Sequence, residues 1–228
     1  MISIKNLNLS YNSRKKVIDE LTLSLLEHKI HGIVGLNGAG KTTLLNAIYG
    51  LKKIDSGEIR CDGKKMTKKE MAYLVTENYF YANITGGEYL SLFRNSTFDT
   101  QGWNGLFGLP LDELIETYSS GMKKKLALLG ILKQDKAIMI LDEPFNGLDI
   151  ETNRIVRAVL LRLKDKEKTI IITSHVLETL TNLCDQIHYL ESGKIKFSKE
   201  KEEFPEFERA LFEDIENKNS GLISELTK

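Results

Sequence analysis

The pattern of apolar and polar residues predicts alternating strands and helices. Largely apolar runs at residues 30–34, 137–141 and 169–173 are typical of strands buried on both faces of a parallel sheet. Residues 1–7 alternate between apolar and polar, as in a strand with one exposed face. Apolar residues recur at helical spacing in residues 44–48, 122–129 and 151–164. This order of elements predicts an α/β protein.

The loop after the strand at residues 30–34 carries a phosphate-binding pattern, G-x-x-x-x-G-K-[ST]. Its glycines let the backbone turn N–H groups toward phosphate oxygens, and the following helix adds its positive N-terminal end. We expect Lys41 to reach the β- and γ-phosphates and Thr42 to bind Mg²⁺. The pattern predicts binding of ATP or GTP by nine residues: Gly35, Leu36, Asn37, Gly38, Ala39, Gly40, Lys41, Thr42 and Thr43.

Two carboxylates end the apolar run at residues 137–141. Ligands of an open parallel sheet bind at the carboxyl ends of its strands, so we expect Asp142 beside the phosphate loop, holding Mg²⁺. Glu143 would polarise a water for attack on the γ-phosphate. The alternative is a solvated acidic turn completed by Pro144, which the phosphate loop upstream disfavours.

The segment Tyr-Ser-Ser-Gly-Met at residues 118–122 predicts a second anion site. Ser119 is a plausible N-cap of a helix, and three lysines follow at residues 123–125. Taken alone, an N-capped basic helix is more often a solvated surface helix. Its place just before the acidic strand favours the functional interpretation.

In their order and spacing, these motifs resemble those of the ATP-binding cassette (ABC) ATPases over about residues 1–200. The motifs are the phosphate loop, residues 118–122, Asp142-Glu143-Pro144, residues 146–149 (Asn-Gly-Leu-Asp) and Thr173-Ser174-His175. The resemblance implies a P-loop NTPase (RecA-like) α/β core with an N-terminal antiparallel β subdomain and an inserted α-helical subdomain. We expect the core at about residues 1–75 and 136–200, the helical subdomain at 76–135, and a charged, solvated tail at 201–228.

The resemblance also implies roles for residues that the motifs alone leave ambiguous. Ser119 and Gly121 would contact the γ-phosphate of ATP bound to the opposite subunit of a head-to-tail dimer. Asp149 would communicate across that dimer, and His175 would hold the γ-phosphate and the attacking water. Tyr11 would stack on adenine, although a tyrosine after a short strand is also ordinary packing.

The chain departs from the family pattern at three positions. The family's glutamine after the phosphate loop is replaced by Thr76, with Glu77 beside it. Glu77 could supply an oxygen to the metal, or it could be a solvated loop carboxylate. Ser120 and Met122 replace a glycine and a glutamine of the signature segment. We expect a functional site whose properties differ from those of the family pattern.

Composition and aromatic content bear on the partners. Equal numbers of basic and acidic residues, 32 each, argue against a nucleic-acid partner. Two cysteines without metal-ligand spacing suit a reducing cytosol.

Eight aromatic residues lie within residues 79–107. They could form the core of a small lobe or a docking patch for a partner. We expect Tyr79, Phe80 and Tyr81 to contact an integral-membrane permease subunit, as the resemblance implies.

The sequence therefore predicts an ATPase subunit that is cytoplasmic, peripheral on the inner face of the membrane, and paired in a homodimer. The sequences of residues 84–90 and 119–123 are similar to those of single-cassette subunits in bacterial drug and lantibiotic exporters. The alternatives are an importer subunit, a soluble ABC ATPase acting on ribosomes or DNA, and a nucleotide-gated module without hydrolysis. Glu143 and His175 together disfavour the last of these.

Overall fold

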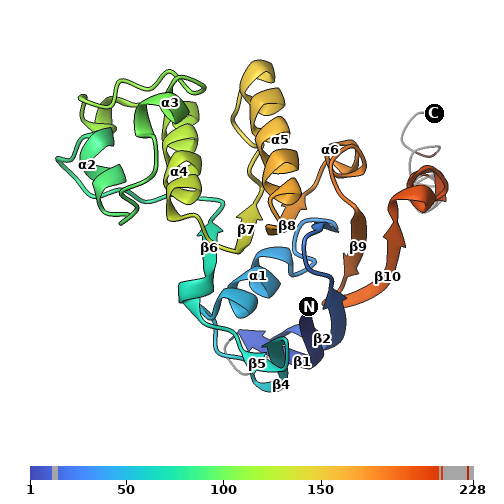
Figure 1. The fold of residues 1–228 in the computed structure, drawn as a ribbon. Helices are drawn as coiled ribbons and strands as arrows, with labels where there is room; N and C mark the ends of the chain where they lie inside the picture. The colour runs from blue at the N-terminus through green and yellow to red at the C-terminus, as the bar shows by residue number, and fades with distance from the viewer. Residues whose placement is uncertain (12–14, 211, 213–224, 226–228) are drawn as a thin grey trace.

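Two β-sheets organise the molecule (Figure 1), of which the computed structural model describes residues 1–11, 15–210, 212 and 225. The larger sheet has the strand order β10-β9-β3-β8-β7-β6 and the smaller one β2-β1-β4-β5. The strands are β1 (Ile2–Tyr11), β2 (Lys15–Leu25), β3 (Ile30–Val34), β4 (Ser56–Cys61), β5 (Lys64–Lys65), β6 (Met71–Leu74), β7 (Ile138–Asp142), β8 (Thr169–Ser174), β9 (Gln186–Glu191) and β10 (Lys194–Glu200). The α-helices are α1 (Lys41–Tyr49), α2 (Gly86–Ser91), α3 (Thr100–Asn104), α4 (Ser120–Gln134), α5 (Ile150–Asp165) and α6 (Leu177–Thr181), with 3₁₀ turns at Lys68–Glu70, Ile115–Thr117 and Lys201–Glu203.

The predicted α/β architecture is confirmed, including its antiparallel N-terminal sheet. In the larger sheet β9, β3, β8, β7 and β6 pair in parallel, and β10 joins the edge antiparallel. All pairs of the smaller sheet are antiparallel. The core strands β3, β7 and β8 are buried along their whole length, as their apolar runs predict.

Helices cover both faces of the larger sheet. On one face α1 lies between the two sheets, where Leu44 joins Ile4 and Ile140 in one core cluster. On the other face the core cluster includes Leu126 of α4, Val156 of α5 and Leu180 of α6. Both clusters meet the parallel strands, so the carboxyl ends of β3 and β7 are held in a rigid frame.

The chain between β6 and β7 forms a helical lobe (residues 75–137) with α2, α3 and α4, to the left in Figure 1. Most of its aromatic residues form its core: Phe80 packs on Tyr89 and Tyr89 on Phe93, with centroids 5.0 and 5.3 Å apart. Tyr79 and Tyr81, in contrast, are 87% and 71% exposed. The expectation that all three consecutive aromatics form a docking surface is therefore wrong for Phe80, whose ring packs inward.

The start of the predicted tail packs on the core. Residues 204–210 are helical, and Phe204 and Phe207 are buried. The ring of Phe207 meets that of Phe197 of β10 at 5.0 Å, and Phe197 stacks on Tyr189 of β9 at 5.1 Å. The expectation of a solvated tail thus fails at its start. Residues 211, 213–224 and 226–228 of the tail lie outside the described residues.

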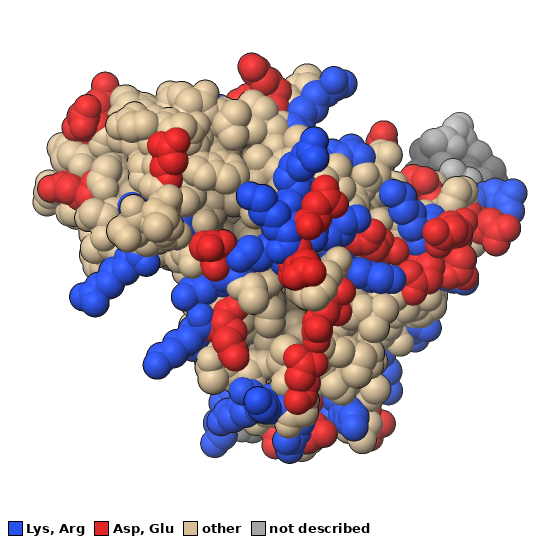
Figure 2. Space-filling model, viewed as in Figure 1, with Lys and Arg blue, Asp and Glu red and all other residues tan. Residues whose placement is uncertain are grey.

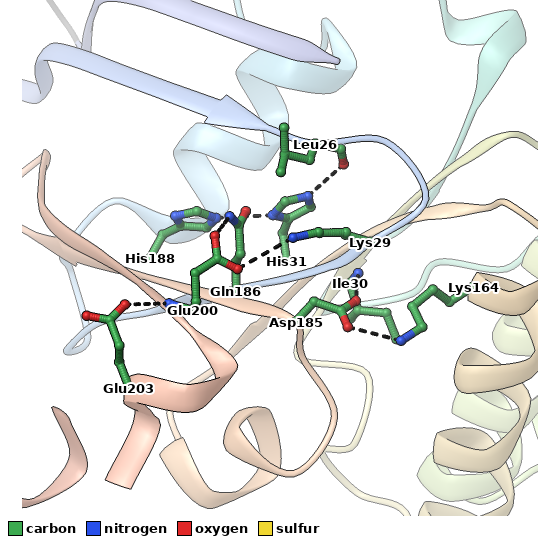
Figure 3. A network of polar contacts seen from close by, with 10 residues as sticks. All are labelled: Leu26, Lys29, Ile30, His31, Lys164, Asp185, Gln186, His188, Glu200 and Glu203. Carbon is green, nitrogen blue, oxygen red and sulfur yellow. Dashed lines mark hydrogen bonds and ion pairs between the residues drawn. The ribbon is translucent and has the colours of Figure 1, made fainter. Parts of the chain in front are cut away.

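A directional chain of hydrogen bonds joins β3, β9 and β10 near the beginning of β3, and Figure 3 shows its two histidines. His31 Nε2 lies 2.8 Å from the carbonyl of Leu26, which can only accept, so Nε2 carries the proton. In the neutral ring His31 Nδ1 then accepts from His188 Nε2 at 3.2 Å, and His188 Nδ1 accepts from the hydroxyl of Ser198 at 2.7 Å. Burial is the main cause that lowers the pKa of both rings, to about 3 for His188.

Asp185 anchors the beginning of β3 in the same region. Its Oδ2 accepts the backbone N–H of Ile30 at 2.8 Å, and its Oδ1 receives the ammonium of Lys164 at 3.0 Å (Figure 3). The strand that leads into the phosphate loop is therefore fixed at its first residue by a charge-assisted contact to α5.

Among the described residues, no helix combines the length and the apolar character needed to cross a membrane.

Candidate functional site

The phosphate loop leaves β3 and enters α1 in a conformation that depends on two glycines. A Cβ on Gly35 would lie 2.3 Å from the carbonyl oxygen of Leu190, so no side chain fits there. Gly40 caps α1 with φ 109°, in the left-handed region. Lys41 is buried and donates from Nζ to the carbonyls of Gly35, at 2.7 Å, and Leu36, at 3.3 Å. The loop is thus closed around its own lysine.

Three threonine hydroxyls surround the carboxylate of Asp142, which is completely buried. Oδ2 accepts from Thr42 at 2.7 Å and from Thr76 at 2.8 Å. Oδ1 accepts from Thr173 at 2.5 Å. Both oxygens of the carboxylate thus act as acceptors, and three hydroxyls fix its orientation.

Glu143 and His175 lie in contact at the ends of β7 and β8. Glu143 Oε2 is 3.1 Å from His175 Nδ1. Glu143 has φ 49°, an uncommon conformation for a residue other than glycine, and its backbone N–H donates to the hydroxyl of Thr173 at 3.0 Å. The turn directs this carboxylate away from the strand, toward the histidine.

These side chains line one cavity of about 530 Å³. The lining residues are Val17, Asn37, Gly38, Gly40, Lys41, Thr42, Thr43, Thr76, Asp142, Glu143, Asn146 and His175. The structure therefore brings together, from distant parts of the sequence, the phosphate loop, the acidic strand end and the histidine. Of the remaining loop residues, Ala39 is buried behind this surface, and Gly35 and Leu36 line a separate hollow beside His175.

The predicted signature segment lies outside the described lining of this cavity. Ser119 caps α4 through its hydroxyl, which accepts the N–H of Met122 at 3.2 Å. A Cβ on Gly121 would lie 3.1 Å from the carbonyl of Gly147, so the segment packs on the loop after β7. That the segment serves a second subunit stays a prediction.

Asp149 connects that loop to α4. Its carboxylate caps α5 by accepting from the backbone N–H and hydroxyl of Thr152, at 2.7 and 2.8 Å, and it pairs with Lys125 of α4 at 3.1 Å. The Thr152 N–H first, then its hydroxyl and the lysine, lower the pKa of Asp149 well below its ordinary value. The signature helix and the Asp149 loop are therefore linked within one chain.

The expected metal contact of Glu77 is not supported by its position. Its carboxylate accepts from the hydroxyl of Tyr79 at 3.3 Å and lies outside the described cavity lining. Thr76, the residue at the aligned position, contacts Asp142 instead. Both residues are exposed, but of the two only Thr76 belongs to the described lining of the cavity.

Tyr11 lies next to the phosphate loop but outside the described cavity lining. Its ring is 42% exposed, its hydroxyl is 3.5 Å from that of Thr43, and the ammonium of Lys52 lies 4.0 Å from its centroid. The lysine over the ring is a cation–π contact. Adenine stacking by Tyr11 therefore stays a prediction, on the ring surface that Lys52 leaves accessible.

Several residues of the site were not singled out from the sequence. Val17 and Asn146 line the cavity, and Thr173 contacts both acidic positions. Lys124 is buried in α4, where burial lowers its pKa to about 8 against the opposing effect of Asp142 and Glu143. The sequence does not reveal that Lys124 is buried, because it is one of three consecutive lysines. Asn146 could have been found, because it lies in the motif at residues 146–149.

The chain resembles known ABC proteins along most of its length. A family model described as "ABC transporter" matches residues 18–146. An uncharacterized ABC transporter ATP-binding protein of Bacillus subtilis, YhcH, is 30% identical over 215 residues, covering 86% of this chain and 68% of the relative. The lantibiotic transport ATP-binding protein SrtF of Streptococcus pyogenes is 28% identical over 210 residues, covering 88% and 91%.

The fold is also that of solved cassettes. A dimeric post-hydrolysis state of the ATP-binding cassette MJ0796, bound to ADP and Pi, aligns with a TM-score of 0.79 at 20% identity. It covers 88% of this chain and 99% of that one. The predicted P-loop NTPase fold is confirmed by this likeness.

Proposed function

From the premise that the chain belongs to the ABC transporter family, as an ATP-binding and ATP-hydrolysing subunit, we propose that it powers the export of a small molecule or peptide. The observation that supports the assigned chemistry is the contact of Glu143 with His175, 3.1 Å apart, in the wall of the cavity that also holds Lys41. Export, rather than import, rests on the resemblance of residues 84–90 and 119–123 to exporter subunits, and the likeness to the lantibiotic transport protein SrtF supports a peptide as the cargo.

The residues divide the work of hydrolysis. Lys41 and the N–H groups of residues 37–43 would bind the phosphates, since the loop and the N-terminal end of α1 form a positive concave surface. Glu143 would accept the proton of the attacking water, and His175 would orient Glu143 and the γ-phosphate. Each would act at the carboxyl end of its strand.

The oxygen donors beside the loop fit Mg²⁺. Thr42 Oγ1 and Asp142 Oδ2 lie 2.7 Å apart, and both are hard ligands. Among the described residues, no group of three or more His, Cys, Asp or Glu side chains is placed to hold a metal ion. Mg²⁺ bound through one or two protein oxygens, with phosphates and water completing its shell, suits such a site. When bound, the ion would neutralise charge on the β- and γ-phosphates.

Two copies would close around two nucleotides. The signature segment of one chain, residues 118–122, would reach the ATP on the other chain, as the family resemblance implies. The pair of Lys125 with Asp149 would move the two interface segments as one unit. Loss of the γ-phosphate would remove contacts that only the closed dimer makes, and the dimer would reopen.

A membrane permease would dock on the helical lobe. Tyr79 and Tyr81 present two exposed rings there, and such side chains are enriched at protein interfaces. Charged side chains are sparse over this lobe on the face in Figure 2, whereas Lys, Arg, Asp and Glu crowd the central band. With such a partner, the protein would be peripheral on the cytoplasmic face of the membrane.

The test is co-purification from the native host. The chain is tagged, membranes are washed in high salt and solubilised, and the proteins that remain bound are identified by mass spectrometry. A stoichiometric multi-span membrane protein is the expected result. Cells that lack the chain should accumulate the cargo if the transporter exports it, and lose the cargo if the transporter imports it. Recovery only with ribosomes or DNA-bound proteins would overturn the proposal.

A further inference from the structure

One buried hydroxyl connects the two acidic positions of the site. Thr173 is completely buried near the end of β8, opposite Asp142 in the parallel register of β7 and β8. Its Oγ1 lies 2.5 Å from Asp142 Oδ1 and 3.0 Å from the backbone nitrogen of Glu143.

The direction of both bonds follows from their chemistry. A backbone N–H only donates, so the hydroxyl of Thr173 accepts from Glu143. Its single proton is then donated to Asp142 Oδ1. The hydroxyl thus accepts from Glu143 and donates to Asp142.

The two bonds have different consequences. The bond to Oδ1 fixes the rotation of the Asp142 carboxylate, so that Oδ2 lies toward Thr42 and the cavity. The bond to the nitrogen of Glu143 satisfies an N–H at the point where the chain leaves the strand with φ 49°. This left-handed turn sets the direction of the Glu143 side chain toward His175.

We propose that Thr173 is a positioning residue, whose hydroxyl sets the orientation of the proposed metal-binding carboxylate relative to the proposed catalytic base. This inference rests on the roles proposed above for Asp142 and Glu143. It assigns to one side chain the coupling of two functions that lie on adjacent residues, the last residue of β7 and the one that follows it. The coupling requires the hydroxyl of Thr173 rather than the shape of its side chain.

Three variants separate these requirements. Thr173→Val keeps the branched shape and removes the hydroxyl, whereas Thr173→Ser keeps the hydroxyl. Thr169→Val is the matched control, because Thr169 lies at the other end of β8, is also buried, and accepts the backbone N–H of His28 at 3.0 Å. The control removes the same kind of bond without contacting either carboxylate.

The full-length variants are compared in kcat and KM for ATP, in nucleotide affinity in EDTA, and in Mn²⁺ affinity with a non-hydrolysable ATP analogue. We expect Thr173→Val to lower kcat roughly ten- to hundredfold and to weaken Mn²⁺ binding, with nucleotide affinity in EDTA unchanged. Thr173→Ser should stay within about threefold of the parent, and Thr169→Val should match the parent in both readouts.

Equal kcat and Mn²⁺ affinity for Thr173→Val and Thr169→Val would overturn the inference. If Thr173→Val does not fold, as judged by its thermal transition, Thr173→Ala replaces it, and equal losses for Ala and Ser would overturn it as well. Parental turnover by Glu143→Gln would instead contradict the proposed function, so the two failures are distinguishable.

Discussion

The hydroxyl of Thr76 lies 2.8 Å from Oδ2 of Asp142 and joins the chain that enters the helical lobe to the end of β7. Thr76 is two residues beyond the end of β6, before α2 begins. A displacement of the lobe by a membrane partner would therefore act directly on this carboxylate. The family resemblance implies a glutamine here, and the shorter threonine makes the contact without an intervening group.

Removing that hydroxyl should impair turnover more than binding. We expect Thr76→Val to lower kcat about tenfold, the effect of losing one hydrogen bond to a charged group, while nucleotide affinity in EDTA stays unchanged. Thr22→Val, in the exposed part of β2, serves as the control. An unchanged kcat for Thr76→Val would show that the contact has no role in hydrolysis.

Removing the charge of Glu143 should stop the cycle with ATP bound. We expect Glu143→Gln to lower kcat at least about a hundredfold, because the amide cannot accept a proton, and to accumulate a dimer in ATP. Turnover is measured by phosphate release and the dimer by size-exclusion chromatography with and without ATP. Glu58→Gln, in the N-terminal sheet, is the control. Parental turnover by Glu143→Gln would exclude the role as base.

Acid should destabilise the folded protein through His31 and His188. Burial lowers the pKa of both rings in the folded state, to about 3 for His188, whereas the unfolded chain binds protons near pH 6.5. The contribution of each ring to the free energy of unfolding is therefore fully present above about pH 6.5. Below that pH it falls by about 1.4 kcal/mol per pH unit until the pH reaches the folded-state pKa of the ring.

The measurement is the free energy of unfolding in denaturant between pH 7.5 and 5. His188→Gln should reduce the slope with pH, whatever its effect on stability at neutral pH. His28→Gln replaces an exposed histidine and is the control. Identical slopes for the parent and His188→Gln would contradict the prediction.

The exposed tyrosines should be needed for the partner and not for chemistry. We expect the double variant Tyr79→Ser, Tyr81→Ser to recover at least about tenfold less permease in the co-purification, while ATP hydrolysis by the isolated chain is unchanged. Leu51→Ser removes a hydrophobic side chain that is 55% exposed after α1, outside the helical lobe, and is the control. Undiminished recovery would place the docking surface elsewhere.

The sequence reveals the parts of the site that are local. The phosphate loop is a contiguous motif, and the carboxylates follow an apolar run whose burial is evident from its composition. The link through Thr173 depends instead on the register of β7 with β8, which pairs Asp142 with Thr173. No periodicity in the sequence specifies that register.

Two further points that the sequence leaves open or misses have the same origin. Whether Thr76 or Glu77 enters the cavity depends on the path of a loop, and the burial of Phe207 depends on rings contributed by β9 and β10. A charged composition around residue 207 predicts solvation on average, but two phenylalanines at helical spacing are sufficient to anchor that segment.

The internal bonds of Lys41 bear on how readily nucleotide is exchanged. Its ammonium has three donors, and the carbonyls of Gly35 and Leu36 accept from it. The side chain is thus ordered when the protein folds. With Lys41 in its proposed role, the rotamer entropy of a lysine, about 2 kcal/mol, would not be lost again when phosphate binds. When ADP and phosphate depart, the same carbonyls would accept from the ammonium again, which would lower the cost of releasing product.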